Sequence, residues 1–342
     1  MGATCAKALT LKVRDNIGVS LTGAVINITT QMGKSTGTNG ITGTSEAYSK
    51  ECPMGSWIVS ETKKSNGVIT ITAYDKMAYL TDNYEPTITF PATCKEVLED
   101  IKTQYSISTN NTTFYKKINT TDKLITKAIS CTVREMIGYI AGLNGCNAVF
   151  NRNGYLDFRF YSKVSVSLDK QIYADSNTEE NETYTITALV SGEGENEITS
   201  GSGKAITFAN PYMTQEILDG LVSSKLPITY SSGKVKYKGN PCLEAGDIIT
   251  VYKTDGTTIS LPIMQHKLTY TGGMYGNIEA YGKSENGDTI SNYKSEAATI
   301  AHKITDVEEV QNNILGAKGG YYELLLDAND SNRPYGTAWW KD

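Results

Sequence analysis

Short runs in which apolar and polar residues alternate occupy most of this sequence. Residues 8–13 (ALTLKV) and 68–73 (VITITA) are two such runs, and the Gly- and Thr-rich stretch 33–45 between them predicts a long loop or flexible hairpin. Alternation with a period of two places apolar side chains on one face of a β-strand. Tyrosine outnumbers phenylalanine 22 to 6, and a composition rich in Thr, Ile, Val and Tyr suits strands. The sequence therefore predicts a mainly β chain.

One stretch follows a helical pattern instead. Thr93 with Glu96, and Thr132 with Glu135, each have the spacing of a capping box, in which the first and last residues of the motif cap a helix N-terminus. The second helix is expected to stop at Gly142 and Gly145, and residues 75–80 are expected to form a helical turn. These signals predict a small α/β unit inserted between strand-rich regions.

Turn signals divide the remaining β sequence. Asn153-Gly154 predicts a hairpin after the second helix. A single further helix is expected to begin at Asn210 as N-cap, with Pro211 in its first position. Beyond it, four runs joined by Asp255-Gly256 and Gly272-Gly273 predict a barrel-like meander. The four runs are residues 246–253, 258–264, 266–271 and 276–281.

The last patterned segment begins near Tyr293 and repeats at alternating spacings of four and three. The a positions hold Ala297, Ile304 and Gln311, and the d positions hold Ile300, Val307 and Ile314. A β-branched residue at d disfavours a parallel dimer and favours trimers or tetramers. The alternative is an amphipathic helix that lies on its own domain.

Charge and apolar patterning narrow the classes of partner. The formal net charge is −5, and the longest cationic runs are the pairs Lys63-Lys64 and Lys116-Lys117. Specific nucleic-acid binding needs clustered cations, so none is expected, whereas passive passage of DNA past walls that are not basic is compatible with this charge. No apolar run approaches the roughly 20 residues of a membrane helix, and no secretory signal begins the chain, so no membrane insertion is expected.

The six cysteines form no CxxC pair and have no metal-ligand spacing. Their separation suits buried free thiols in a reducing compartment, and one or two disulfides are the alternative. They are Cys5, Cys52, Cys94, Cys131, Cys146 and Cys242.

Histidine is too scarce for the common catalytic sites. A Ser/His/Asp or Cys/His site must use His266 or His302. His266 falls inside the predicted meander and His302 falls on the heptad helix, so both are expected to be structural or surface residues. No catalytic residue is assigned.

Cofactor and metal motifs are also missing. Residues 201–204 (GSGK) resemble the end of a phosphate loop, but Ile198 stands where that motif needs glycine and Ala205 replaces Ser/Thr. Zinc and calcium spacings are absent, and nothing marks a carboxylate pair among the 37 acidic residues. No cofactor-binding or metal-ligating residue is assigned.

Several of these blocks, taken in order, resemble the hub region of phage minor tail proteins. This is the tail-tip or baseplate-hub family, whose members in phages and prophages of Gram-positive bacteria often continue into a tail-associated lysin or fibre. The resemblance covers about residues 4 to 340. The matching blocks are residues 68–80, 93–98, 132–141 with the Asn-Gly hairpin, 239–249 (GNPCLEAGDII), 261–264 and 279–283.

The resemblance implies a trimeric structural subunit and not an enzyme. Two tube-like β-barrel domains related by pseudo-symmetry would flank the α/β domain, so that three subunits present six β domains to a six-fold tail tube. The homotrimer would contact the tube or distal tail protein on one side and tip or fibre proteins on the other. It would lie at the tail tip of the virion after assembly in the bacterial cytoplasm.

Five parts of the chain follow from these patterns. The fold class is mainly β with an α+β insertion, two tube-like β-barrel domains and a C-terminal helix. Relatives usually carry strands before the point where Met1 stands, and residues 333–340 (RPYGTAWW) look like the opening of a further module, so the chain is either a fragment or a short member of the family. The parts are a first β domain at 1–90, which strands from about 162–209 would complete, an α/β domain at 91–161, a second β-barrel domain at 162–290, a helix and trimeric coiled coil at 291–316, and the start of a further module or tail at 317–342.

Two other functions fit some of the same features. A tail-associated cell-wall hydrolase or peptidase would have its catalytic part outside this chain. A carbohydrate-binding adhesin would suit the β content and the many tyrosines, and it would need exposed aromatic side chains gathered on one face.

Overall fold

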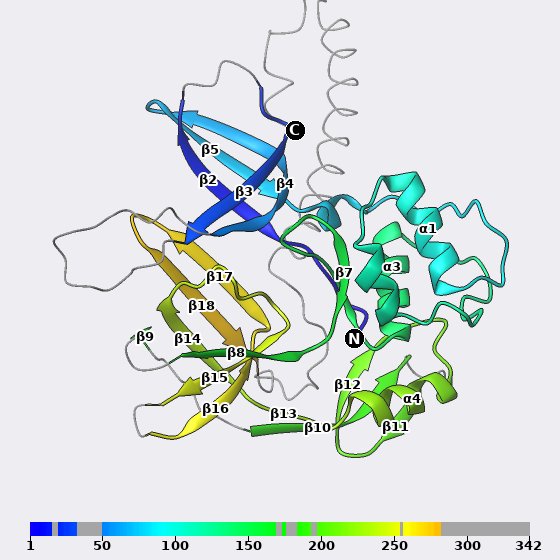
Figure 1. Ribbon diagram of the computed structural model, residues 1–342. Coiled ribbons are helices and arrows are strands. Elements are labelled where there is room, and N and C mark those ends of the chain that lie inside the picture. The colour runs from blue at the N-terminus through cyan, green and yellow to red at the C-terminus, as the bar shows by residue number, and fades with distance from the viewer. Residues whose placement is uncertain are drawn as a thin grey trace, which may run out of the picture. The chain divides into compact units, whose positions relative to one another are not determined.

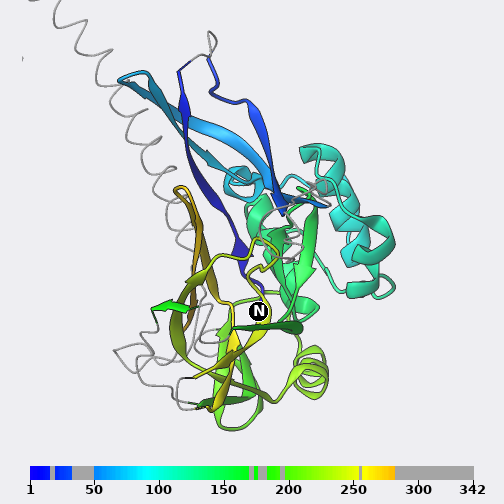
Figure 2. The same ribbon diagram turned by 60° about the vertical axis from the view of Figure 1, so that its left-hand side comes forward.

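The first alternating runs form a four-stranded antiparallel sheet, called here the first sheet. In the computed structural model, β2 (Ala8–Arg14) pairs along its length with β5 (Val68–Tyr74), as the alternation predicts. The strand order is β2-β5-β4-β3, with β4 at Lys50–Ser65 and β3 at Val25–Met32 (Figure 1). Ile69, Ile71 and Ala73 of β5 are buried with Trp57 and Val59 of β4, so one face of the sheet carries its own core. Figure 2 shows how strongly these strands twist.

The structure describes residues 1–15, 20–32, 50–168, 173–175, 183–192, 197–253 and 256–281. They belong to one compact unit, Met1–Ala297. The predicted loop at 33–45, the heptad helix with His302 and the segment 317–342 lie outside the described residues. Across the described ranges, no helix has the length and apolar character needed to cross a membrane.

The α/β unit forms where the capping boxes predicted helices. Thr93 and Thr132 each accept a hydrogen bond from the backbone N–H three residues on, and Glu96 and Glu135 each complete the box. The predicted turn after β5 is the short helix η1, capped by the Asp75 side chain. The elements of the unit are β1 (Thr4–Cys5), η1 (Lys76–Tyr79), α1 (Cys94–Tyr105), α2 (Asn111–Phe114), η2 (Tyr115–Lys117), α3 (Val133–Leu143), β6 (Asn147–Phe150) and β7 (Leu156–Arg159).

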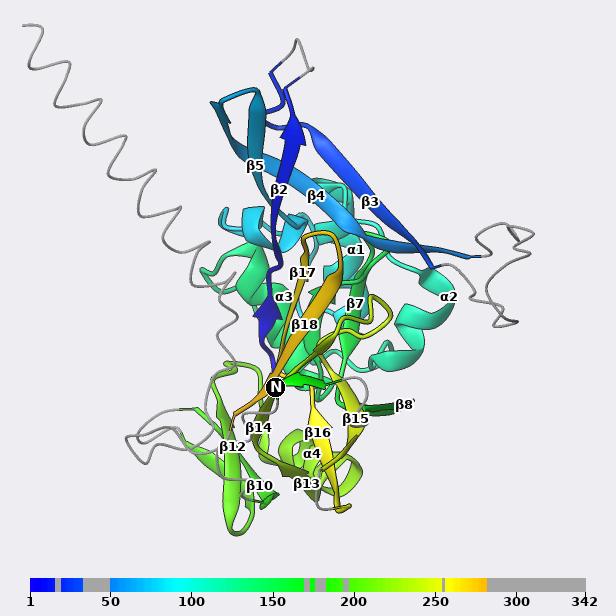
Figure 3. The same cartoon turned by 90° about the vertical axis from the view of Figure 1, so that its left-hand side faces the viewer.

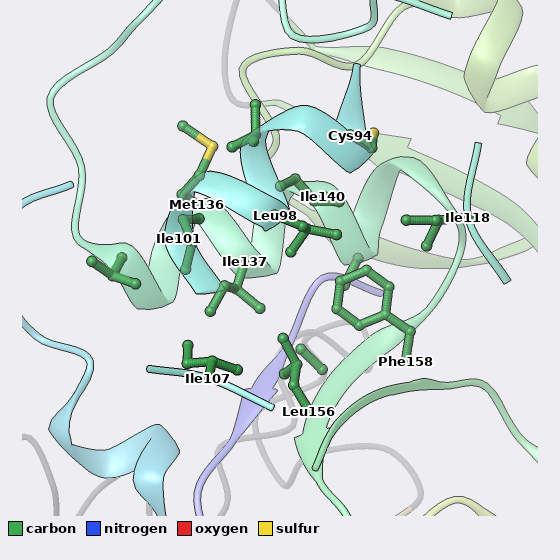
Figure 4. Close-up of a cluster of buried hydrophobic side chains, with 14 of the residues drawn as sticks. Cys94, Leu98, Ile101, Ile107, Ile118, Met136, Ile137, Ile140, Leu156 and Phe158 are labelled. Atoms are coloured by element: carbon green, nitrogen blue, oxygen red, sulfur yellow. The ribbon is translucent and has the colours of Figure 1, made fainter. Parts of the chain in front are cut away.

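Helices α1 and α3 share a core with a three-stranded sheet of order β1-β6-β7. Figure 4 shows Leu98 and Ile101 of α1 and Ile137 of α3 gathered with Leu156 and Phe158 of β7. The hairpin predicted at Asn153-Gly154 joins β6 to β7. The same core also takes in residues from distant parts of the chain, namely Ala6, Met77, Leu80, Tyr84 and Tyr212.

The prediction that Gly142 ends the second helix is wrong. Helix α3 continues to Leu143, and Gly142 lies buried inside it. A Cβ on Gly142 would lie 3.4 Å from the Gly2 Cα, and one on Gly138 would lie 2.7 Å from the Gly2 carbonyl oxygen. Because these two positions of α3 carry no side chain, the N-terminal segment can pack directly against the helix. Gly145, with φ of 63°, follows the helix as predicted.

Two sheets share the core of the next part, called here the second β region. The core joins Val235 and Tyr237 of β14, Ile278 of β18, Ile249 of β15 and Leu261 of β16. Both sheets can be followed in Figure 3. Their orders are β16-β15-β8 and β17-β18-β14-β9, with bounds β8 Ser162–Leu168, β9 Tyr173–Asp175, β14 Gly233–Lys238, β15 Asp247–Tyr252, β16 Thr258–Pro262, β17 Gln265–Tyr270 and β18 Met274–Ala280.

The predicted meander is correct as two hairpins and wrong as one continuous sheet. β15 pairs with β16, and β17 pairs with β18. Between the hairpins the chain changes sheets after Ile263, whose backbone N–H still donates to the Asp247 carbonyl of β15. Met264 then donates its backbone N–H to Glu279 of the other sheet.

A last small sheet packs against helix α4 (Gln215–Lys225). In it β10 (Thr183–Ser191) pairs with β11 (Ile198–Gly201), β12 (Lys204–Phe208) and β13 (Ile228–Ser231). The predicted start of α4 at Asn210 and Pro211 is wrong, since Thr214 is the N-cap. The Asn210 side chain instead accepts the Tyr212 N–H and donates to the Tyr139 carbonyl, which ties this turn to α3.

The fold is thus mainly β with an inserted α/β unit. Among the described residues, the first sheet takes all its strands from before residue 75, and no strand from 162–209 joins it. The division of the chain into five domains stays a prediction.

Candidate functional site

A tight turn of the α/β unit carries Arg152 to the first sheet. Asn151 shapes the turn, since its side-chain oxygen accepts the backbone N–H groups of Asn153 and Tyr155. A Cβ on Gly154 would lie 2.9 Å from the Ser56 Cβ of β4, so the turn packs closely on that strand. Arg152 donates to the Cys52 Sγ of β4 at 3.0 Å and to the Cys242 carbonyl at 2.7 Å.

The loop before β15 and the first residue of that strand supply two carboxylates, Glu244 and Asp247. Asp247 is 4% exposed, and its side chain accepts the Glu244 backbone N–H at 2.8 Å, which fixes the loop. Arg159 at the end of β7 reaches both acids, at 3.1 Å to Glu244 and 2.8 Å to Asp247. Lys7 and Arg152 each lie 3.6 Å from Glu244. We call these five residues the charged junction.

Three of the parts described above meet at the charged junction. Lys7 leads into the first sheet, Arg152 and Arg159 belong to the α/β unit, and Glu244 and Asp247 belong to the second β region. Burial alone would raise the pKa of Glu244, but the three cations hold that pKa below its ordinary value. Glu244 is therefore ionised at neutral pH, and three cations face two carboxylates.

Two thiols adjoin the charged junction. The Sγ atoms of Cys52 and Cys242 lie 4.0 Å apart. Cys52 is buried in β4, whereas Cys242 is exposed, contrary to the expectation that all six thiols are buried. The backbone N–H of Cys242 donates to the Asn240 side chain, which orders the loop that carries this thiol.

A groove of about 680 Å³ opens beside the charged junction. Its walls include Lys116, Lys117 and Lys225 in addition to Arg152 and Arg159, against the carboxylates of Asp157 and Glu244. Lys117 is paired with Asp157. The excess of cations means that the groove favours anionic groups, although the chain as a whole is acidic.

The structure places His266 in β17. Its ring stacks on Tyr237 and shares a 2.9 Å hydrogen bond with the Tyr237 hydroxyl. It also forms a hydrogen bond with the backbone of Leu243, and burial lowers the pKa of His266 to about 4. The neutral ring thus supports the loop that carries Glu244.

Residues 201–204, which resemble the end of a phosphate loop, form the tight turn that leads from β11 on one side of β10 to β12 on its other side. Gly201 and Gly203 have positive φ, as such a turn requires, and the Lys204 ammonium lies 4.3 Å from the centroid of the Tyr184 ring. Within the described ranges, no three His, Cys, Asp or Glu side chains are grouped as a metal site would need.

Sequence reasoning did not find the charged junction. Its two Arg159 ion pairs join residues 85 and 88 positions apart, and the pairs of Glu244 with Lys7 and Arg152 span more of the chain still. The one signal was the block 239–249, which was singled out for its resemblance and which contains Glu244 and Asp247.

The arrangement is that of a structural joint. Each carboxylate forms an ion pair with a cation from another part of the chain, and each arginine also donates a hydrogen bond to a backbone carbonyl. Such a network fixes the parts relative to one another more than it prepares any one group for chemistry.

No family model and no curated protein sequence matches this chain. Among solved structures it is similar to a tail protein from Neisseria meningitidis MC58, with 13% identity over 66% of this chain and 78% of that one at a TM-score of 0.45. It is similar to the 43 kDa tail protein of prophage MuSo2 from Shewanella oneidensis, with 13% identity, 80% and 93% coverage and a TM-score of 0.41. A chain of the phage P2 baseplate in its activated conformation has 11% identity, 80% and 88% coverage and a TM-score of 0.30.

Proposed function

We propose that this chain is a structural subunit of a phage tail or phage-tail-like particle. Three copies form a hub that joins the tail tube to the tail tip and lines the channel. The hub contacts the tube or distal tail protein on one side and tip or fibre proteins on the other, and DNA passes it without specific binding. It lies at the tail tip of the virion and assembles in the bacterial cytoplasm.

The observation that carries this proposal is the position of block 239–249. This block is the most telling part of the resemblance to tail-tip hub proteins, and its Glu244 and Asp247 bind Lys7, Arg152 and Arg159. Three of the other resembling blocks form β5 with η1, the start of α1, and α3. The resembling residues therefore belong to the elements that hold the parts of the chain together, as a subunit that bears load in an assembly requires.

The role we propose is non-catalytic. Both carboxylates of the charged junction are engaged by cations, whereas a catalytic acid, base or nucleophile needs a partner that prepares it for a substrate. Cell-wall cleavage by this chain would contradict the proposal.

The two exposed tyrosines of the β17–β18 hairpin do not form the single aromatic face that an adhesin would need. Tyr270 is 75% exposed and Tyr275 is 46% exposed, both on the hairpin β17–β18. Tyr270 pairs with Met274 and Tyr275 pairs with Thr269. Neighbouring pairs in an antiparallel ladder point to opposite faces, so the two rings do not share a surface.

Light scattering after size exclusion tests the trimer directly. The full chain should have the mass of a trimer, and a version ending at Gly287 should dissociate at higher concentration, because it lacks the heptad segment. A monomer at every concentration for both versions would contradict self-association through that segment.

A further inference from the structure

The contact between Cys52 and Cys242 joins two parts of the chain that are far apart in sequence. The two residues are separated by 190 positions, on β4 of the first sheet and on the loop before β15. Their Sγ atoms lie 4.0 Å apart, which is van der Waals contact, and a disulfide bond of about 2.05 Å needs only a small further approach.

The surroundings of the pair suit thiol–disulfide chemistry. Cys242 is exposed and can meet a reagent from solution, whereas Cys52 is buried behind it. The Arg152 guanidinium lies 3.0 Å from the Cys52 Sγ, so it stabilises a thiolate there and opposes the effect of burial, which raises the pKa of Cys52. The pair thus consists of an accessible thiol and a resolving thiol that has a fixed cation beside it.

We propose that Cys52 and Cys242 are a cross-linking site, which a small-molecule disulfide oxidises to a covalent bond between the first sheet and the second β region. The Cys242 thiolate attacks one sulfur of the reagent, forms a mixed disulfide and releases the other half as a thiolate. The Cys52 thiolate then attacks the Cys242 sulfur, forms the Cys52–Cys242 bond and expels the second half. Two electrons pass from the protein to the reagent, and the two protons of the cysteines go to the two released thiols.

The consequence is a lock beside the charged junction. The segment that leads into the first sheet is already paired with the second β region through Lys7 and Glu244, and the disulfide adds a covalent link beside that ion pair. Closing a loop of this length removes much conformational freedom from the unfolded chain. If the proposed tail function holds, the thiols stay reduced during assembly in the cytoplasm and the bond forms after the particle leaves the cell.

Oxidation of the isolated chain tests the cross-link. The reduced protein is incubated under native conditions with oxidised glutathione, and its intact mass, its non-reduced peptide map and its Tm are measured. We expect a mass lower by two hydrogens, one peptide pair that joins Cys52 to Cys242, and a Tm higher than that of the reduced protein. Cys131→Ala, which removes a buried thiol elsewhere, should cross-link like the wild type.

Two results would overturn the cross-link. One is a glutathione that remains on Cys242 while Cys52 stays free. The other is a Cys242→Ser variant that still loses two hydrogens, because another pair would then be responsible. Because the isolated chain is used, a failure of the cross-link would not affect the tail proposal. Conversely, if the protein were absent from particles, the cross-link would still hold, and only the proposal that it forms after release from the cell would fail.

Discussion

Arg159 is the residue on which the charged junction most depends, because it alone binds both carboxylates and a backbone carbonyl. Arg159→Ala leaves the buried Asp247 without its cation, and we expect the free energy of unfolding to fall by about 2–3 kcal/mol. Arg159→Lys keeps the charge but loses the forked geometry, so it should fall between alanine and wild type. Urea denaturation measures both.

Lys63→Ala is the matched control for this loss. Lys63 also has a carboxylate partner, Glu61, but both side chains are more than half exposed. Its loss should change the free energy of unfolding by less than about 0.5 kcal/mol. Equal effects of Arg159→Ala and Lys63→Ala would mean that the charged junction contributes no more than a surface pair.

The buried His266 should make the free energy of unfolding depend on pH. Burial lowers its pKa to about 4 in the folded chain, whereas an unfolded histidine titrates near 6.5. The unfolded chain therefore binds the proton first as the pH falls, so the contribution of His266 is complete above about pH 6.5 and is lost towards pH 4. His266→Gln should remove about 1–2 kcal/mol of this decline. Denaturation curves of the wild type and the variant, measured at several pH values between these two pKa values, test this effect. An identical decline in the variant would contradict the lowered pKa of His266.

At the scale of elements, the approach of the N-terminal segment to α3 gives a sharp test of packing. Gly138→Ala puts a Cβ 2.7 Å from the Gly2 carbonyl oxygen, so we expect a loss of about 1–3 kcal/mol despite the better helix propensity of alanine. Gly220→Ala in α4 is the matched control, because a Cβ there meets no atom within 4 Å. It should be neutral or stabilising by up to about 1 kcal/mol. Thermal unfolding of both variants measures the difference, and a neutral Gly138→Ala would contradict the close packing.

The sequence predicted the elements whose signals are local. Thr93, Thr132 and the Asn153-Gly154 turn each act within a few residues, and each formed as expected. The start of α4 was wrong because Asn210 is used by a tertiary hydrogen bond to Tyr139. Competition of that kind depends on residues 71 positions away, so no local pattern contains it.

Local sequence patterns could not predict the charged junction for the same reason. Arg159 and Asp247 are 88 positions apart, and each looks like an ordinary surface charge in sequence. The switch of sheets after Ile263 also lacks a local signal, because the strand that accepts the chain afterwards follows only from the packed core.

At the scale of the whole molecule, the proposed function combines a rigid subunit with a symmetric assembly. The charged junction fixes the first sheet, the α/β unit and the second β region within one subunit, and the trimer we propose would present those parts to a tube of higher symmetry. The two properties are separable, because variants of the junction should weaken the fold, whereas loss of the segment after Gly287 should weaken association.

The copy number of this chain in purified particles tests directly whether it is a trimeric structural hub. Tail or tail-like particles from cells that carry the gene are washed at high salt, and isotope-labelled peptides of this chain and of the tail-tube protein are used to count both. For a trimeric hub we expect three copies per particle, retained after the wash. Absence from washed particles, or a copy number that is not a multiple of three, would contradict a trimeric structural hub.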